Sequence, residues 1–252
     1  MTQLDDRHKA QIADLTNVKL GLAVAERIVR RKPTLPGLGV LHGPPGYGKS
    51  SACSRIGAMF QTAYLSVKPL WTINGFLGAL CAELCVRAPN SKDGRFEAAK
   101  EALLSGPNLL MLDEADHLCH GKMPVIEFVR TLSDETGIAI LLVGEETLPD
   151  LLRRCSGRTY SRVLQWQPAQ PCTVEDARAL AALYCPALTL ADDLISEIVA
   201  KTHGVTRLVA VNLDTIGETA ATERWDRVDL RKWGAAKIMT GAAPAARRAV
   251  RA

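Results

Sequence analysis

Apolar residues along the chain form two kinds of pattern. Four short segments rich in apolar or β-branched residues have the length of strands, and they cover residues 38–41, 62–67, 109–112 and 138–143. Between and before them, apolar residues recur at helical spacing over residues 9–31, 50–60, 73–86, 95–104 and 124–134. Residues 89–94 are polar and predict a loop. The alternation predicts a parallel sheet covered by helices on both sides.

Beyond Pro168 the pattern changes. No further strand is predicted, and apolar residues keep helical spacing over residues 174–184, 191–202, 207–219 and 226–238. This part of the sequence predicts a small, all-helical companion to the α/β part.

A glycine-rich motif lies between the first predicted strand and the next helix. It has the form Gly-x-x-x-x-Gly-Lys-Ser, in which the glycines let backbone N–H groups turn toward phosphate oxygens at a helix N-terminus. We expect it to bind the phosphates of ATP through Gly43, Pro44, Pro45, Gly46, Tyr47, Gly48, Lys49, Ser50 and Ser51. In this interpretation Lys49 bridges the β- and γ-phosphates, and the Ser50 hydroxyl ligates Mg²⁺.

A pair of carboxylates follows the third predicted strand. The strand carries Asp113 to the carboxyl edge of the sheet, where it would hold Mg²⁺ together with Ser50. Glu114, one residue further on, is a candidate for positioning or deprotonating the attacking water. The order of these residues after a P-loop predicts a Mg²⁺-dependent ATPase.

Composition and charge exclude several classes of protein. The chain has 252 residues, 47% hydrophobic and 23% charged, which suits a packed core and not a disordered chain. Its apolar runs are too short to cross a bilayer, and the N-terminus lacks a signal pattern. Seven cysteines without a CxxC pair favour reduced thiols. We therefore expect a soluble protein of a bacterial or phage-infected cytoplasm, without a membrane partner. The net charge of +4 permits a polyanionic partner.

The order of these motifs resembles the AAA+ superfamily over about residues 10–235. The resemblance implies a polar residue at the end of the fourth strand that senses the γ-phosphate, where this chain has Glu145. It also implies a second sensor in the lid, which matches Arg207 in a Gly-x-x-Arg element that begins at Gly204. An arginine finger acting on the neighbouring subunit is expected among Arg158 and Arg162, with Arg154 as a reserve.

The resemblance gives a domain organisation. An N-terminal helical segment covers residues 1–32, the nucleotide-binding α/β domain 33–168, the helical lid 169–238 and a basic, alanine-rich tail 239–252. A trans-acting arginine implies a homo-oligomer, either a ring or a helical filament, whose ATPase activity depends on assembly.

Within the superfamily the chain resembles the Mu B-type and related (TniB/TnsC-like) transposon target selectors. It shares their small size, the Leu-Leu-Met-Leu-Asp-Glu-Ala-Asp-His-Leu block and the Leu-Leu-Val-Gly that follows. The resemblance implies ATP-dependent assembly on double-stranded DNA with little sequence preference, and recruitment and activation of a transposase. Candidate DNA contacts are Lys68, Trp71, Thr72, Lys92, Arg95 and Lys122. A helicase loader or replication initiator, and an ExeA-like secretion ATPase that does not bind DNA, remain alternatives.

Overall fold

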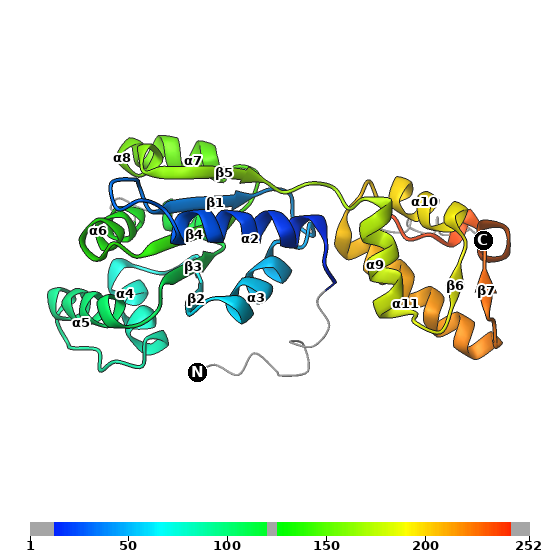
Figure 1. Ribbon diagram of the computed structural model, residues 1–252, viewed down its shortest axis with the longest axis horizontal. Helices are drawn as coiled ribbons and strands as arrows, with labels where there is room; N and C mark the ends of the chain where they lie inside the picture. Colours follow the sequence, from blue (N-terminus) through cyan, green and yellow to red (C-terminus); the bar gives the residue numbers. More distant parts are fainter. Residues whose placement is uncertain (1–12, 120–124, 243–252) are drawn as a thin grey trace, which may run out of the picture. The chain divides into compact units, whose positions relative to one another are not determined.

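The computed structural model describes residues 13–119 and 125–242, and the chain divides into two compact units between Gln170 and Pro171 (Figure 1). In the first unit the elements are α2 (Thr16–Val29), β1 (Leu38–His42), α3 (Lys49–Met59), β2 (Thr62–Ser66), α4 (Ile73–Glu83), α5 (Lys92–Ser105), β3 (Leu109–Asp113), the 3₁₀ helix η1 (Ala115–Cys119), α6 (Ile126–Thr136), β4 (Ala139–Gly144), α7 (Leu148–Cys155), α8 (Gly157–Ser161) and β5 (Val163–Pro168).

The first unit is built on a five-stranded parallel sheet in the order β2-β3-β4-β1-β5. The central strands β3 and β4 are buried along their whole length, as expected for strands covered on both faces. In β2 and β5, at the two edges, most side chains are partly exposed. Because all strands run the same way, their carboxyl ends meet at one edge of the sheet, where ligands bind in open α/β folds.

Alternate side chains of each central strand pack against different helices. On one face, Met111 and Leu141 join a core with α2 and α3. On the other face, Leu110 and Leu142 join a larger core with α4, α5, α6 and α7. The period of two in a strand thus divides the apolar residues between two helical layers. This arrangement confirms the predicted parallel sheet with helices on both sides.

The structure differs from the predicted elements of this unit in three places. A fifth strand, β5, pairs with β1 and was not predicted; its alternating polar residues suit a half-exposed edge. The predicted loop at residues 89–94 ends early, because the Ser91 side chain accepts a hydrogen bond from the Gly94 N–H and caps α5. The short helices α7 and α8 lie beside β5 (Figure 1) and had no predicted counterpart.

The second unit consists of α9 (Val174–Tyr184), β6 (Thr189–Leu190), α10 (Asp192–Lys201), α11 (Thr206–Glu223), β7 (Arg227–Val228), α12 (Leu230–Trp233) and the 3₁₀ helix η2 (Ala235–Lys237). It is not entirely helical, because β6 and β7 pair in parallel. The helix predicted over 226–238 is divided, since α12 is capped by Asp229 and ends at Gly234, where φ is 86°. Among the described residues no helix is long and apolar enough to cross a membrane.

Candidate functional site

The glycine-rich motif forms the turn between β1 and α3. Gly46 and Gly48 have φ values of 83° and 80°, which side chains with a Cβ rarely adopt. Gly48 is also the N-cap of α3, so the loop leads directly into the positive end of that helix. At Gly43 a Cβ would lie 2.8 Å from the Cβ of Ala169, so the loop has no room for a side chain there. These features fit a turn that binds phosphate through backbone N–H groups.

The Lys49 ammonium group lies over this loop. Its Nζ donates hydrogen bonds to the carbonyl oxygens of Gly43 at 2.6 Å and Pro44 at 2.9 Å. Both carbonyls belong to the phosphate-binding turn, so the positive charge is held at the place where phosphates would enter. Ser50 and Ser51 follow in the first turn of α3 and are exposed.

Asp113 and Ser50 come together at the carboxyl end of β3. Ser50 Oγ donates to Asp113 Oδ2 at 3.1 Å, and the Tyr64 hydroxyl donates to the same oxygen at 3.1 Å. Burial, followed by the charge of Asp113, raises the pKa of the Tyr64 hydroxyl, which therefore stays protonated and remains a donor. A hydroxyl and a carboxylate are the hard oxygen ligands that Mg²⁺ takes together with substrate phosphates and water. The two residues therefore fit a Mg²⁺ ion.

Glu114 turns the chain sharply after β3. Its φ is 55°, a left-handed conformation that is costly for a residue with a Cβ, and its backbone N–H donates to Asp113 Oδ1 at 2.9 Å. The side chain is exposed, with Oε2 3.7 Å from His117 Nε2. Backbone strain of this kind concentrates at functional sites. Here it directs a carboxylate outward beside the Asp113–Ser50 pair.

Glu145 is the predicted sensor at the carboxyl edge of the sheet. Glu145 follows β4 with an exposed side chain, and its backbone N–H donates to Asp116 Oδ2 at 2.9 Å. Its role as a γ-phosphate sensor stays a prediction. Asp116 lies in the acidic block that follows β3, and the sequence pattern does not indicate a role for it.

Asn17 supports the phosphate loop from α2, and the sequence analysis missed it. Its Nδ2 donates to the carbonyl oxygens of Tyr47 and Gln170, both at 2.7 Å, and its Oδ1 accepts from the Gln170 N–H at 2.8 Å. The side chain is only 5% exposed. A buried amide with three partners is worth more than three surface contacts, because each partner would otherwise lose its hydrogen bond away from water. An asparagine within a helical pattern has no sequence signal that marks this role.

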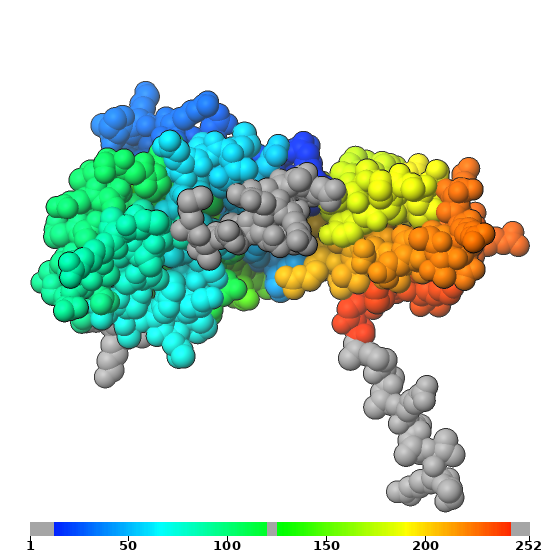
Figure 2. Space-filling model, turned by 90° about the horizontal axis from the view of Figure 1, so that it is seen from below, coloured from blue at the N-terminus to red at the C-terminus, as the bar shows by residue number. Residues whose placement is uncertain are grey.

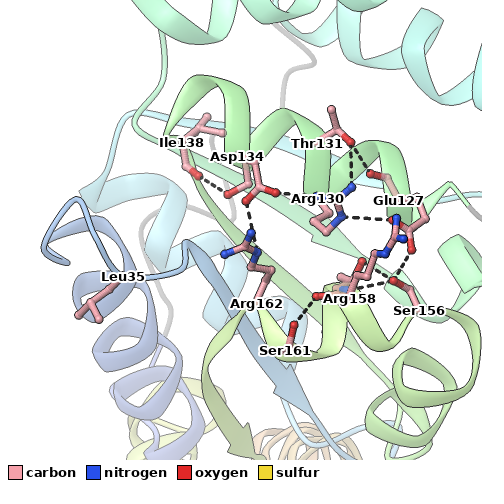
Figure 3. A network of polar contacts seen from close by, with 12 residues as sticks. Leu35, Glu127, Arg130, Thr131, Asp134, Ile138, Ser156, Arg158, Ser161 and Arg162 are labelled. Carbon is pink, nitrogen blue, oxygen red and sulfur yellow. Dashed lines mark hydrogen bonds and ion pairs between the residues drawn. The ribbon is translucent and has the colours of Figure 1, made fainter.

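The candidate arginine fingers lie around α8, next to the acidic residues of α6 (Figure 3). Arg162 Nε is 3.7 Å from Asp134 Oδ1, and Arg130 donates to the second oxygen of Asp134 at 2.6 Å. The reserve candidate Arg154 is exposed in the last turn of α7.

Arg158 lies beside Glu127 in the same network. The pKa of Glu127 is lowered, first by a hydrogen bond from Ser156 and then by Arg130, with a smaller contribution from Arg158. Glu127 is thus ionised and accepts hydrogen bonds from Ser156 and Arg130, whereas Arg162 lies within ion-pair distance of Asp134. Both arginines are exposed on the first unit.

The residues predicted to contact DNA divide into two groups. Thr72 caps α4 by accepting the Gly75 N–H, Trp71 packs edge-on against Phe76, and Arg95 donates to Pro89 and Asn74. These three stabilise the fold. Lys68 and Lys92 are exposed, and neither side chain has a hydrogen bond or ion pair within residues 13–119 and 125–242. Part of the segment from β2 to α5 (cyan to teal) lies at the surface on the face seen in Figure 2. Lys122 lies outside the described residues.

Arg207 lies in the first turn of α11, in the second unit, and its side chain is exposed. The backbone explains why the Gly-x-x-Arg element begins with a glycine. Gly204 has a φ of 67°, and a Cβ there would lie 2.6 Å from the Cβ of Pro171. The Gly204 carbonyl also accepts the Cys172 N–H at 2.8 Å. The contact of Arg207 with a nucleotide stays a prediction.

The turn between β1 and α3 and the acidic end of β3 define a P-loop nucleotide-binding fold. Within that class, the order of the five strands and the helices that flank them are those of the AAA+ fold. Residues 31–152 match the family model of the AAA domain.

Solved structures agree with this fold. Cdc6p from Pyrobaculum aerophilum is 18% identical with a TM-score of 0.64, over 84% of this chain and 62% of that one. ORC1 of Aeropyrum pernix, solved in complex with DNA, is 18% identical with a TM-score of 0.61, over 87% and 63%. Domain III of the replication initiation protein DnaA from Thermotoga maritima is 16% identical with a TM-score of 0.57, over 89% and 90%. No curated protein matches the sequence.

The chain therefore spans less than two thirds of the Cdc6p and ORC1 structures. At sequence identities of 16–18%, the similarity to these structures shows a shared fold and nothing more.

Proposed function

We propose that this protein is a Mg²⁺-dependent ATPase whose ATP-bound subunits assemble on double-stranded DNA. The observation that carries the proposal is the convergence of Lys49, Ser50 and Asp113 at one edge of the sheet, with Glu114 directed outward beside them. Bound Mg²⁺ would neutralise charge that develops on the phosphates. Lys49 would hold the phosphates, and Glu114 would orient water and accept its proton.

The DNA part of the proposal rests on exposed cations and on a structural relative. Lys68 and Lys92 are exposed on the segment from β2 to α5, and ORC1, which has the same fold, was solved in complex with DNA. Contacts of this kind bind phosphates without reading bases, so affinity should fall steeply with salt. As a finer proposal, we assign the assembly to target selection and activation of a transposase. A replication-initiator role is the second candidate, favoured by the likeness to Cdc6p and DnaA.

Co-sedimentation and electron microscopy with a long random-sequence duplex test the proposal. We expect filaments or rings on the DNA with ATP, none with ADP, and loss of binding at high salt. Equal displacement by competitor duplexes of unrelated sequence supports the target selector, whereas preference for one sequence supports the initiator. If the protein sediments identically with and without duplex DNA in ATP, the DNA function is wrong.

We further propose that Arg158 completes the ATP site of a neighbouring subunit. Arg158 is exposed, and its acidic neighbour Glu127 already has Ser156 and Arg130 as partners. Arg158→Ala alone should lose about 10³-fold or more in turnover, and mixing it with Glu114→Gln subunits should restore part of the activity, because an intact Glu114 site then receives Arg158 from its neighbour. Arg153→Ala is the control, since Arg153 pairs with Asp150 at 2.8 Å on the exposed surface of α7. No recovery of turnover in the mixture of Arg158→Ala and Glu114→Gln subunits would exclude the trans role.

A further inference from the structure

A buried carboxylate lies beside the nucleotide site but takes no part in the proposed contacts with phosphate, Mg²⁺ or water. Asp116 lies in η1, three residues after Asp113, and is 9% exposed. Its Oδ2 accepts the Glu145 N–H at 2.9 Å, which ties the acidic turn after β3 to the turn after β4. Its Oδ1 is buried and has no hydrogen-bond partner among the described residues. Burying a carboxylate oxygen without a partner is costly, so such an arrangement needs an explanation.

The end of β4 is shaped around this carboxylate. At Gly144 a Cβ would collide with Asp116 Oδ2 and would lie 2.8 Å from Leu148 Cδ2. Only glycine therefore fits at residue 144 while Asp116 keeps its place. The polar side chain at the end of β4 thus comes from η1, and the turn after β4 contributes the backbone N–H of Glu145.

The same carboxylate faces the strand that leads into the phosphate loop. His42, the last residue of β1, is paired in register with Gly144. Burial, followed by the charge of Lys49, lowers the pKa of His42, and Asp116 acts in the opposite direction. The imidazole is therefore mainly neutral near pH 7. Its Nδ1 is also buried without a hydrogen-bond partner in the described part of the chain. Asp116 thus lies where the ends of β1, β3 and β4 meet.

We propose that Asp116 is a positioning residue of the ATPase site. This proposal rests on the proposed ATPase function. Asp116 holds the Gly144–Glu145 turn at a fixed position relative to Glu114 and the phosphate loop. Asp116 accepts from the backbone N–H of Glu145, so it acts through the position of that turn. Loss of the contact should therefore slow hydrolysis while leaving the Lys49 contacts, and hence nucleotide affinity, in place.

Two substitutions disturb the same contact from opposite sides. Asp116→Ala removes the acceptor, and Gly144→Ala displaces it with a methyl group. Each should lower kcat roughly tenfold to hundredfold, as loss of an orienting hydrogen-bond partner does around other sites, with the Kd for ATP changed less than about threefold. Asp116→Asn keeps an oxygen acceptor of the same size and should recover most of the activity. Asp150→Ala, an exposed carboxylate on α7, is the matched control.

The double variant Asp116→Ala/Gly144→Ala separates this role from general damage. If the methyl at residue 144 acts only by displacing the Asp116 side chain, it should have little further effect once that side chain is absent, so the two changes should be strongly non-additive. Additive losses in kcat, or equal losses of kcat and ATP affinity, would overturn the proposal.

Amide hydrogen exchange tests the link without nucleotide. The Glu145 N–H lies in an exposed turn, and its protection should fall in Asp116→Ala and Gly144→Ala while Asp150→Ala leaves it unchanged. Protection equal to wild type in both variants would show that Asp116 does not hold the turn. Should wild type fail to hydrolyse ATP, the proposed function is wrong, and this exchange result alone upholds or overturns the link.

Discussion

Lys49→Ala is expected to abolish measurable ATP binding at micromolar concentrations. Lys49 Nζ donates to two carbonyls of the phosphate loop, so its charge is fixed where the β- and γ-phosphates would lie. Hydrogen bonds to charged groups contribute about 1.5–3 kcal/mol each, and the loss of contacts to two phosphates should cost at least about 3 kcal/mol. That corresponds to a Kd roughly 150-fold weaker. Alanine leaves the loop glycines and the α3 N-terminus unchanged.

Isothermal titration calorimetry with ATP and Mg²⁺ measures this effect in the absence of DNA. Lys19→Ala is the matched control, because it removes the same charge from an exposed side chain that pairs with Asp14 at 3.3 Å. Thermal unfolding should show that both variants are folded. ATP affinity of Lys49→Ala within about threefold of the control would mean that the β1–α3 turn is not the phosphate site, because loss of a charge-assisted contact should weaken ATP binding by more than that.

The phosphate loop was predictable because its chemistry is local. Gly43, Gly48, Lys49 and Ser50 are close in sequence, and the apolar strand before them and the helix after them have clear periodicity. The acidic end of β3 was predictable for the same reason. The central strands, buried on both faces, also appear as continuous apolar runs.

The missed features depend on contacts between distant segments. In β5, Gln165 and Gln167 interrupt the apolar pattern because the strand lies at an edge, and only its pairing with β1 makes it a strand. Asn17 and Gln170 are 153 residues apart and meet only in the folded unit. The contact between Asp116 and the Glu145 backbone likewise needs the adjacent placement of β3 and β4. The sequence pattern indicates in which helix or strand a residue lies. The roles of β5, Asn17 and Asp116 depend on residues that become neighbours only in the folded protein.

Glu114→Gln is expected to keep ATP binding and lose hydrolysis. Glutamine has the same shape, can adopt the backbone geometry already imposed at φ 55°, and leaves the Glu114 N–H bond to Asp113 intact. It cannot accept a proton from water, so kcat should fall about 10²–10⁴-fold. The lost contact with His117, at 3.7 Å, should matter little for stability, because the Glu114 side chain is 61% exposed.

Single-turnover hydrolysis and ATP titration separate the two effects, and Glu146→Gln, an exposed carboxylate two residues beyond β4, is the control. If subunits remain on DNA only while ATP is intact, Glu114→Gln should also form DNA-bound assemblies that persist after excess ATP is removed, whereas wild type should disassemble as it hydrolyses. Normal hydrolysis by Glu114→Gln would assign the base to another group. Lost hydrolysis with unchanged disassembly would mean that binding and release of ATP, without its cleavage, control assembly.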